Sequence, residues 1–481
     1  MIRIHLILSL LLWLQLLLAP SAFCYPISFT DSGGTPVTIK ELPQRVVSLS
    51  PAATEILLAL EAQESLAGIT YHSAIGKKTA GIPLVGGFAS PSLAIIKKIN
   101  PDLIILTDQH ENLRKKLRAT NATLVALTTT SLDASSNNIL LLGRIFNRKK
   151  EAEALLKKNR DQIATIAEKV SKIPAQKRKR VIRIMGRNTL MTPGDDSFQQ
   201  AFIRAAGGIS PTLNKTGKIV SVSEEDWLNF NPQVIYACGG DRSLEEKILG
   251  TSPWKDVEAV AEDRIYYFSC DLTCRAASNT GLFVSWLAAK IYPEEFSLQD
   301  NFVHNSGIRS SRPIELSLDY VSNTRIADSV HYDFIDKTLV VEFNAPQKIL
   351  STLEGTKDGV LAVGNHYFPP PGWGLGHDLG VDGLRNRVRL VTGLAPEKTG
   401  FLFTGANMDN LAVSKKSYRE MTVYALVTAG VKSNAVRTSK DDGRYYEPGT
   451  INILLLSNMQ LSSRAMTRAL ITATEAKTAA L

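Results

Sequence analysis

Short apolar runs alternate with amphipathic stretches over residues 45–297 of this chain. The apolar runs lie at residues 46–49, 103–106, 181–185, 234–237 and 265–268. Runs of this length are typical of buried strands, and residues 54–60, which follow the first run, have the pattern of a helix. Strands that alternate with helices indicate parallel α/β units. We therefore predict an α/β fold for residues 45–297.

A stretch rich in Lys, Glu, Ala and Leu separates the earlier strands from the later ones. From Lys149 to Ile173 its apolar residues recur at helical spacing, and no Gly or Pro occurs before Pro174. These features predict one long helix. Two α/β lobes joined by a single long helix would form a rigid clamp with a cleft between them.

The pattern changes after this α/β region. Residues 298–315 are polar and contain several turn-forming Ser, Gly and Pro residues, so we predict a linker there. Residues 326–334 and 338–343 then alternate between apolar and polar positions as strands do. The end of the chain is rich in Asn, Gly and Thr. We predict a separate α+β domain over residues 316–481, with loops that hold a site.

Length, composition and charge agree with this division. The chain has 481 residues, more than the ~250–300 that one hydrophobic core usually organises. With 44% hydrophobic and 21% charged residues, it has the composition of a folded globular protein. The net charge of +9 comes from Lys and Arg scattered along amphipathic stretches, as on solvated helix faces. We therefore predict no nucleic-acid partner.

The N-terminus has the order of a secretory signal. Arg3 precedes an apolar run from Ile4 to Leu18, and a short stretch of small residues and Pro follows. The run is shorter than the ~20 residues of a membrane helix. We predict a signal peptide at residues 1–24 and a periplasmic location. A lipid anchor at Cys24 is the alternative, although Phe23 is bulkier than lipoprotein signals normally allow.

Three cysteines remain after export, Cys238, Cys270 and Cys274. In an oxidising compartment this odd number predicts one disulfide and one spare thiol. Cys238 pairs with Cys270 or with Cys274 on this reading. No His lies near enough in sequence to complete a tetrahedral zinc site, so we predict no metal here.

Two strings and the long helix resemble those of ABC-transporter binding proteins for cobalamin, haem and ferric siderophores. The strings are RVVSLSPAATE at residues 45–55 and NPDLI at 100–104. The resemblance covers residues 45–297 and implies a two-lobed class III periplasmic binding protein with a rigid helix between the lobes.

The cobalamin binders among these proteins offer the nearest match. Asp271 and Arg275 form an Asp-x3-Arg pattern where that family contacts its ligand, and Tyr71 and Phe88 fall at its aromatic positions in the first lobe. A corrinoid is a flat ring fringed with amides, so aromatic faces and a few charged groups suit it. Leu272 departs from the family, which commonly has an aromatic residue at this position.

The resemblance also implies an ABC transporter permease as partner. The family uses one exposed acidic residue on each lobe to meet arginines of the permease. Glu225 fits the position in the second lobe, whereas Ala94 occupies the matching position in the first lobe. We therefore expect a weakened docking contact.

A series of polar strings occurs in order in the last third of the chain. They are GNH at residues 364–366, VDGL at 381–384, FTGANM at 403–408, TAGVKSNA at 428–435, EPGTIN at 447–452 and TATEAKT at 472–478. Together they resemble the adenosylcobinamide amidohydrolase (CbiZ-type) family over residues 316–481. The resemblance implies hydrolysis of the amide between the corrin ring and aminopropanol, which gives cobyric acid.

These strings contain the groups that amide hydrolysis needs. His366 can act as base or acid near neutral pH. The candidates for its carboxylate partner are Asp382, Asp409, Glu447 and Glu475. Asn407 is a donor for the developing oxyanion, and the predicted contacts to ring amides are Asn365, Asn434 and Asn452. No Gly-x-Ser-x-Gly elbow and no Cys occurs here, which disfavours a serine-elbow or cysteine acyl-enzyme. We predict no required cofactor.

Two functions remain open on this evidence. In the first, an exported enzyme binds cobinamide or cobalamin in one module and cuts the amide in the other. In the second, a non-catalytic corrinoid-binding protein serves an ABC importer. The chain ends at Leu481, directly after the last string, where family members usually continue through a Gly/Thr-rich segment. Siderophore or haem capture is disfavoured because the second module is specific to corrinoids.

Overall fold

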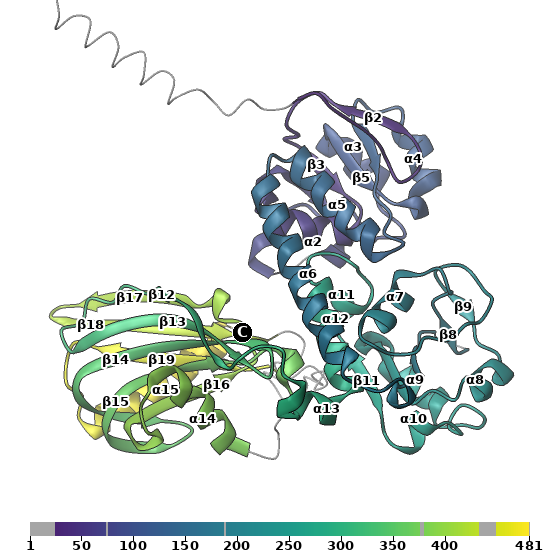
Figure 1. Cartoon of the computed structure of the whole chain (residues 1–481). Coiled ribbons are helices and arrows are strands. Elements are labelled where there is room, and N and C mark those ends of the chain that lie inside the picture. The colour runs from purple at the N-terminus through teal and green to yellow at the C-terminus, as the bar shows by residue number, and fades with distance from the viewer. Residues whose placement is uncertain (1–24, 74–75, 187–188, 376–379, 432–448, 481) are drawn as a thin grey trace, which may run out of the picture. The chain divides into compact units, whose positions relative to one another are not determined.

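The computed structural model describes residues 25–73, 76–186, 189–375, 380–431 and 449–480, and Figure 1 shows them. The predicted signal peptide and Cys24 lie outside these ranges. The chain forms two compact units. The first contains residues up to 161 together with 196–201 and 271–281, and the second contains the rest. Within the described ranges, no helix is both long and apolar enough to cross a bilayer.

The first unit is built on a parallel four-stranded sheet. Its order is β4-β3-β5-β6, and its strands are β3 (Val46–Ser48), β4 (Leu66–Ile69), β5 (Leu103–Leu106) and β6 (Thr123–Ala126). Its helices are α2 (Pro51–Ala59), α3 (Leu93–Ile99), α4 (Glu111–Leu117) and α5 (Leu132–Ile145). All four residues of β5 are buried, as expected for a strand covered on both faces. A hairpin of β1 (Ile27–Thr30) and β2 (Pro36–Ile39) precedes the sheet.

The predicted long helix is confirmed. α6 runs through 23 residues from Lys149 to Ser171. It ends just before Pro174, as the sequence pattern predicts, because the ring of Pro cannot continue a helix. Figure 1 shows α6 as one continuous element.

A second α/β set follows α6 in the second unit. Its parallel sheet has the order β11-β10-β7, with β7 (Val181–Arg183), β10 (Val234–Cys238) and β11 (Ile265–Phe268). Its main helices are α7 (Phe198–Ala205), α8 (Glu224–Phe230), α9 (Arg242–Leu249) and α12 (Thr280–Ile291). The apolar runs that predicted these strands are confirmed, and their residues form the core of this part around Trp227.

Two antiparallel-rich sheets make up the C-terminal part. The larger has the order β12-β13-β14-β15-β16, with β12 (Gly307–Pro313), β13 (Val321–His331), β14 (Phe334–Ser351), β15 (Gly355–Tyr367) and β16 (Thr399–Thr404). The smaller contains β17 (Ala412–Tyr418), β18 (Met421–Ala429) and β19 (Ile451–Ser457). Helices α14 (Gly380–Thr392) and α15 (Ser463–Ala480) complete it (Figure 1).

The larger sheet is covered on both faces. Leu339 and Val341 belong to a core shared with Leu426 and Leu456 of the smaller sheet. Val340, between them, points to the other face and packs with Val388 of α14. Because both faces of the sheet are packed, consecutive residues of β14 are buried. One of these faces is covered by α14.

Part of the predicted linker is a strand. Residues 307–313 form β12 and pair with β13 at the sheet edge. Six of the seven residues of β12 are exposed, so the segment has the polar sequence of a linker. An edge strand needs only backbone pairing, and its side chains can therefore stay in water.

Candidate functional site

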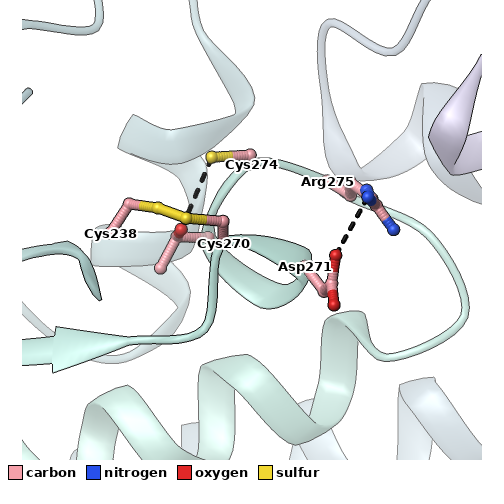
Figure 2. The surroundings of a disulfide bond; sticks show 6 residues. Cys238, Cys270, Asp271, Cys274 and Arg275 are labelled. Atoms are coloured by element: carbon pink, nitrogen blue, oxygen red, sulfur yellow. Dashed lines mark hydrogen bonds and ion pairs between the residues drawn. A yellow bond between two sulfur atoms is a disulfide. The ribbon is translucent and has the colours of Figure 1, made fainter. Parts of the chain in front are cut away.

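Arg275 is held in the first unit by several acceptors. Its Nη2 donates to Asp271 Oδ1 at 2.9 Å, as Figure 2 shows, and to the His72 carbonyl at 2.6 Å. Its Nη1 lies 3.7 Å from Glu55 Oε2 and has no hydrogen-bond partner among the described residues. The side chain of Arg275 is 10% exposed, whereas that of Asp271 is 44% exposed. The predicted pair is therefore assembled, with Asp271 open to solvent.

Glu55 is a site residue that sequence reasoning missed. It is buried in α2, where its Oε1 accepts hydrogen bonds from Ser278 Oγ at 2.5 Å and Asn279 Nδ2 at 3.2 Å. Burial raises the pKa of Glu55, and the Ser278 hydrogen bond and the charge of Arg275 oppose that effect. A lone Glu in the apolar helix 51–60 was the available signal, because a buried carboxylate needs partners.

Tyr71 and Phe88 have different environments. Tyr71 is 57% exposed, and its ring lies so close to Gly87 that a Cβ there would approach Tyr71 Oη to 2.7 Å. Phe88 is partly buried and packs edge-on against His110, with ring centroids 5.2 Å apart. The His110 Nε2 and the Phe88 carbonyl are 2.7 Å apart, and the Phe88 N–H donates to His72 Nδ1 at 3.0 Å. Tyr71 is therefore largely exposed, with its ring 4.1 Å from that of His72 between centroids, while Phe88 supports the loop.

Two short helices occupy equivalent places before buried strands. Ser92 caps α3 and Ser223 caps α8, and each helix ends in a left-handed Asn, at Asn100 (φ 50°) and Asn231 (φ 42°). This equivalence aligns Glu225 with Ala94, as the resemblance implies. Both residues are exposed.

The disulfide joins Cys238 to Cys270 (Figure 2). Cys270 comes directly before Asp271, and Cys238 is the last residue of β10. Of the two pairings that the sequence left open, the structure contains this one. Cys274 is exposed and takes no part in a disulfide.

A buried polar cluster lies on the α14 face of the larger C-terminal sheet. His366 of β15 is directly opposite Thr338 of β14, and its Nδ1 is 2.9 Å from Thr338 Oγ1. Its Nε2 lies 3.4 Å from Oδ2 of Asp336, two residues earlier on β14. Arg387 of α14 brings its Nη1 to 3.6 Å from the same Asp336 oxygen.

This cluster is buried and incompletely paired. His366 is 0% exposed and Asp336 is 1% exposed. Counting every described residue, neither oxygen of Asp336 nor His366 Nε2 has a hydrogen-bond partner. His331, on the neighbouring strand, also has an unpaired Nδ1, and burial together with the charge of Arg387 lowers the pKa of His331 to about 4. Buried polar groups without partners are rare and often mark functional sites.

Asn365 and Asn452 lie on the opposite face of the sheet. Asn365 Nδ2 donates to Thr428 Oγ1 at 2.8 Å, and Asn365 Oδ1 accepts from Asn452 Nδ2 at 2.9 Å. Asn452 Nδ2 also donates to the carbonyl of Phe403 at 2.9 Å. These amides tie the two sheets together. The structure thus does not bring them to His366.

Of the other predicted residues, those that the structure describes do not contact His366 either. Asn407 Oδ1 accepts from the Asp409 N–H at 3.0 Å, and Asp409 pairs with Lys337 and Arg312. Asp382 is 85% exposed and pairs with Arg385. Glu475 is exposed on α15. Asn434 and Glu447 lie outside the described residues. The carboxylate beside His366 is therefore Asp336, which stands at a buried position of a strand and belongs to none of the strings.

Two further observations concern metal ligands and cavities. In the part of the chain that the structure describes, no group of three or more His, Cys, Asp and Glu side chains is arranged to hold a metal. A cavity of about 590 Å³ lies beside α15 and is lined mainly by apolar residues, including Phe343, Leu454 and Leu470. This cavity is on the face of Asn365, so it does not open onto His366.

Comparisons with known proteins divide the chain as the fold does. Residues 46–271 match the family model of periplasmic binding proteins, and residues 319–481 match that of adenosylcobinamide amidohydrolase (CbiZ). An uncharacterized protein of Methanocaldococcus jannaschii is 42% identical over 160 residues, which is 30% of this chain and 62% of that protein. A cobalamin-binding protein of Halobacterium salinarum is 27% identical over 226 residues, which is 45% of this chain and 60% of that protein.

A solved structure shows the fold of the binding module. The molybdate periplasmic binding protein MolA of a Haemophilus influenzae ABC transporter is similar, with a TM-score of 0.50 and 19% identity, over 57% of this chain and 94% of that one. The class III periplasmic binding fold is thereby confirmed. The chain thus joins a periplasmic binding protein domain, of an extracytoplasmic class that serves ABC transporters, to an adenosylcobinamide amidohydrolase (CbiZ) domain.

Proposed function

We propose that this protein salvages corrinoids in the periplasm: the first module captures cobinamide or cobalamin, and the second hydrolyses the amide that holds aminopropanol, releasing cobyric acid. The observation that carries the proposal is the buried His366, beside a carboxylate that accepts no hydrogen bond from the described residues, in the domain that matches the amidohydrolase family. The cobalamin-binding relative supports a corrinoid as the ligand of the first module.

The binding module offers groups that suit a corrinoid. Tyr71 presents an exposed ring to the flat macrocycle. Asp271 and Arg275 are a charged pair that can accept from and donate to propionamides of the ring edge. Glu225 remains available for a permease.

Hydrolysis in the second module follows from the chemistry of His366. A water oxygen bonds to the amide carbon while one of its protons moves to His366. The C–N bond then breaks as His366 passes that proton to the leaving nitrogen, giving a carboxylic acid and an amine. Such general base and acid catalysis contributes about 10²–10⁴ in rate. No cofactor enters this scheme.

The test pairs binding with turnover. The full chain is titrated with cobinamide, cobalamin and haem, and adenosylcobinamide mixtures are analysed by mass spectrometry for cobyric acid and aminopropanol. We expect corrinoid binding, no haem binding, and release of aminopropanol that is lost in His366→Ala. Binding should weaken roughly ten- to a hundred-fold in Asp271→Ala and Arg275→Ala, because each loses a charged hydrogen bond worth about 1.5–3 kcal/mol.

A non-catalytic corrinoid-binding protein is the second candidate. The 0% exposure of His366 favours it, since a catalytic base must meet the substrate. Corrinoid binding without any aminopropanol release from the full chain would establish this second function.

A further inference from the structure

Asp336 is buried at a cost that the fold alone does not explain. It is 1% exposed, and none of the described residues gives either of its oxygens a hydrogen bond. His366 Nε2 lies 3.4 Å from Asp336 Oδ2 and is likewise without a hydrogen bond among the described residues. A buried carboxylate that accepts no hydrogen bond is costly even with the Arg387 cation 3.6 Å away, so a third group that bonds to both side chains is expected beside them.

The contacts of His366 show which kind of group fits. Its Nδ1 lies 2.9 Å from Thr338 Oγ1, which can accept a hydrogen bond from Nδ1–H. In that tautomer the lone pair of the ring is on Nε2. A lone pair on Nε2 and a carboxylate are both acceptors and cannot bond to each other. A water molecule that donates one hydrogen to each would satisfy both, and its oxygen lone pairs would remain free.

We infer that His366 and Asp336 together hold the water that attacks the amide, and that the Arg387 cation, 3.6 Å from Asp336 Oδ2, holds Asp336 in place for this task. The inference rests on the proposed function and assigns the role of carboxylate partner to Asp336. In the reaction, one water proton moves to His366 Nε2 as the oxygen–carbon bond forms. Asp336 then stabilises the imidazolium until the proton leaves with the amine nitrogen.

Arg387 is built into this arrangement. Its guanidinium carbon lies 5.4 Å from the ring centroid of Tyr332 and 5.6 Å from that of Phe368, and its Nη2 donates to the Leu375 carbonyl at 3.4 Å. Two ring contacts and a carbonyl hold the cation beside Asp336. Among the described residues, His331 on β13 and Tyr367 on β15 are further titratable groups near this cluster, and burial lowers the pKa of His331 and raises that of Tyr367, so both are uncharged near neutral pH.

The sharpest test uses opposite charge changes. Asp336→Asn should lower kcat for adenosylcobinamide hydrolysis by about 10²–10⁴ and move the acidic limb of the pH–rate profile to lower pH. Arg387→Gln should move that limb to higher pH, because a cation near His366 is lost. Asp358→Asn, at the exposed end of β15, and Arg389→Gln, exposed on α14, are the matched controls and should behave as the parent.

A second readout does not depend on turnover. The Cε1–H resonance of His366, assigned with His366→Gln, should titrate at lower pH in Asp336→Asn and at higher pH in Arg387→Gln than in the parent. If either shift is absent, or if Asp336→Asn turns over as fast as the parent, the inference is wrong. If Asp336→Asn does not fold, the Arg387→Gln shift decides. A parent without turnover but with both shifts contradicts the proposed function alone, leaving the electrostatic pairing in place.

Discussion

Asn365 and His366 are neighbours in β15, yet their side chains lie on opposite faces of the larger sheet. Successive residues of a strand alternate in this way, so one string of the sequence serves two separate environments. Asn365 joins an amide network between the sheets, and His366 joins the buried cluster under α14. Residues that share a motif therefore need not share a site.

Tyr71 and Phe88 should respond differently to truncation. Tyr71→Ala removes a ring that is 57% exposed, so it should weaken corrinoid binding about ten-fold with little effect on thermal stability. Phe88→Ala removes a ring packed on His110 and should cost about 1–3 kcal/mol of stability. Titration with cobinamide and thermal melting of each full-length variant would separate the two roles. Equal losses of affinity without destabilisation would contradict this assignment.

Glu55 should make the stability of the first unit depend on pH. Its pKa is raised above 4.5 in the folded state, mainly by burial, so folding favours the protonated form. The stabilising contribution of this group is complete below pH 4.5 and is lost as the pH rises through the raised pKa. The melting temperature of the parent minus that of Glu55→Gln should therefore fall as the pH increases from 4 to 7. A difference that rises with pH would show that Arg275 and Ser278 outweigh burial.

The disulfide should stabilise the second unit. It closes a loop with a sequence separation of 32 residues, and a native bridge of this size contributes about 2–4 kcal/mol. Cys238→Ser with Cys270→Ser should lower the melting temperature, whereas Cys274→Ser, the matched control, should not. Thermal melting of the parent, the double variant and Cys274→Ser under oxidising conditions checks this expectation.

The fold could be predicted further than the site. The apolar runs and the long helix identified the strands and α6, because burial on both faces leaves a strong pattern in sequence. The edge strand β12 left no such pattern, since its side chains are exposed. Asp336 and Glu55 were missed for a related reason: each is an acid at a buried position of its strand or helix, and its partners come from residues distant in sequence. Only the assembled fold brings Arg387 to Asp336 and Ser278 to Glu55.

The amide network between the sheets gives the last prediction. Asn365→Ala would remove the donor to Thr428 Oγ1 and one of the two acceptors of Asn452 Nδ2, which keeps its bond to the Phe403 carbonyl. Loss of a buried hydrogen-bond partner costs about 1–3 kcal/mol. The C-terminal domain should therefore melt at lower temperature in this variant.

The same substitution should leave the pH dependence of the reaction unchanged, because the side chains of Asn365 and His366 lie on opposite faces of the sheet. Asn344→Ala, an exposed Asn of β14 that donates to the carbonyl of Asp319 at 2.8 Å, is the matched control and should lower the melting temperature less. Aminopropanol release measured across pH, well below the melting temperature, tests the separation of the two faces. A shifted pH profile in Asn365→Ala would instead show that Asn365 acts on the reacting amide, as the motif alone had suggested.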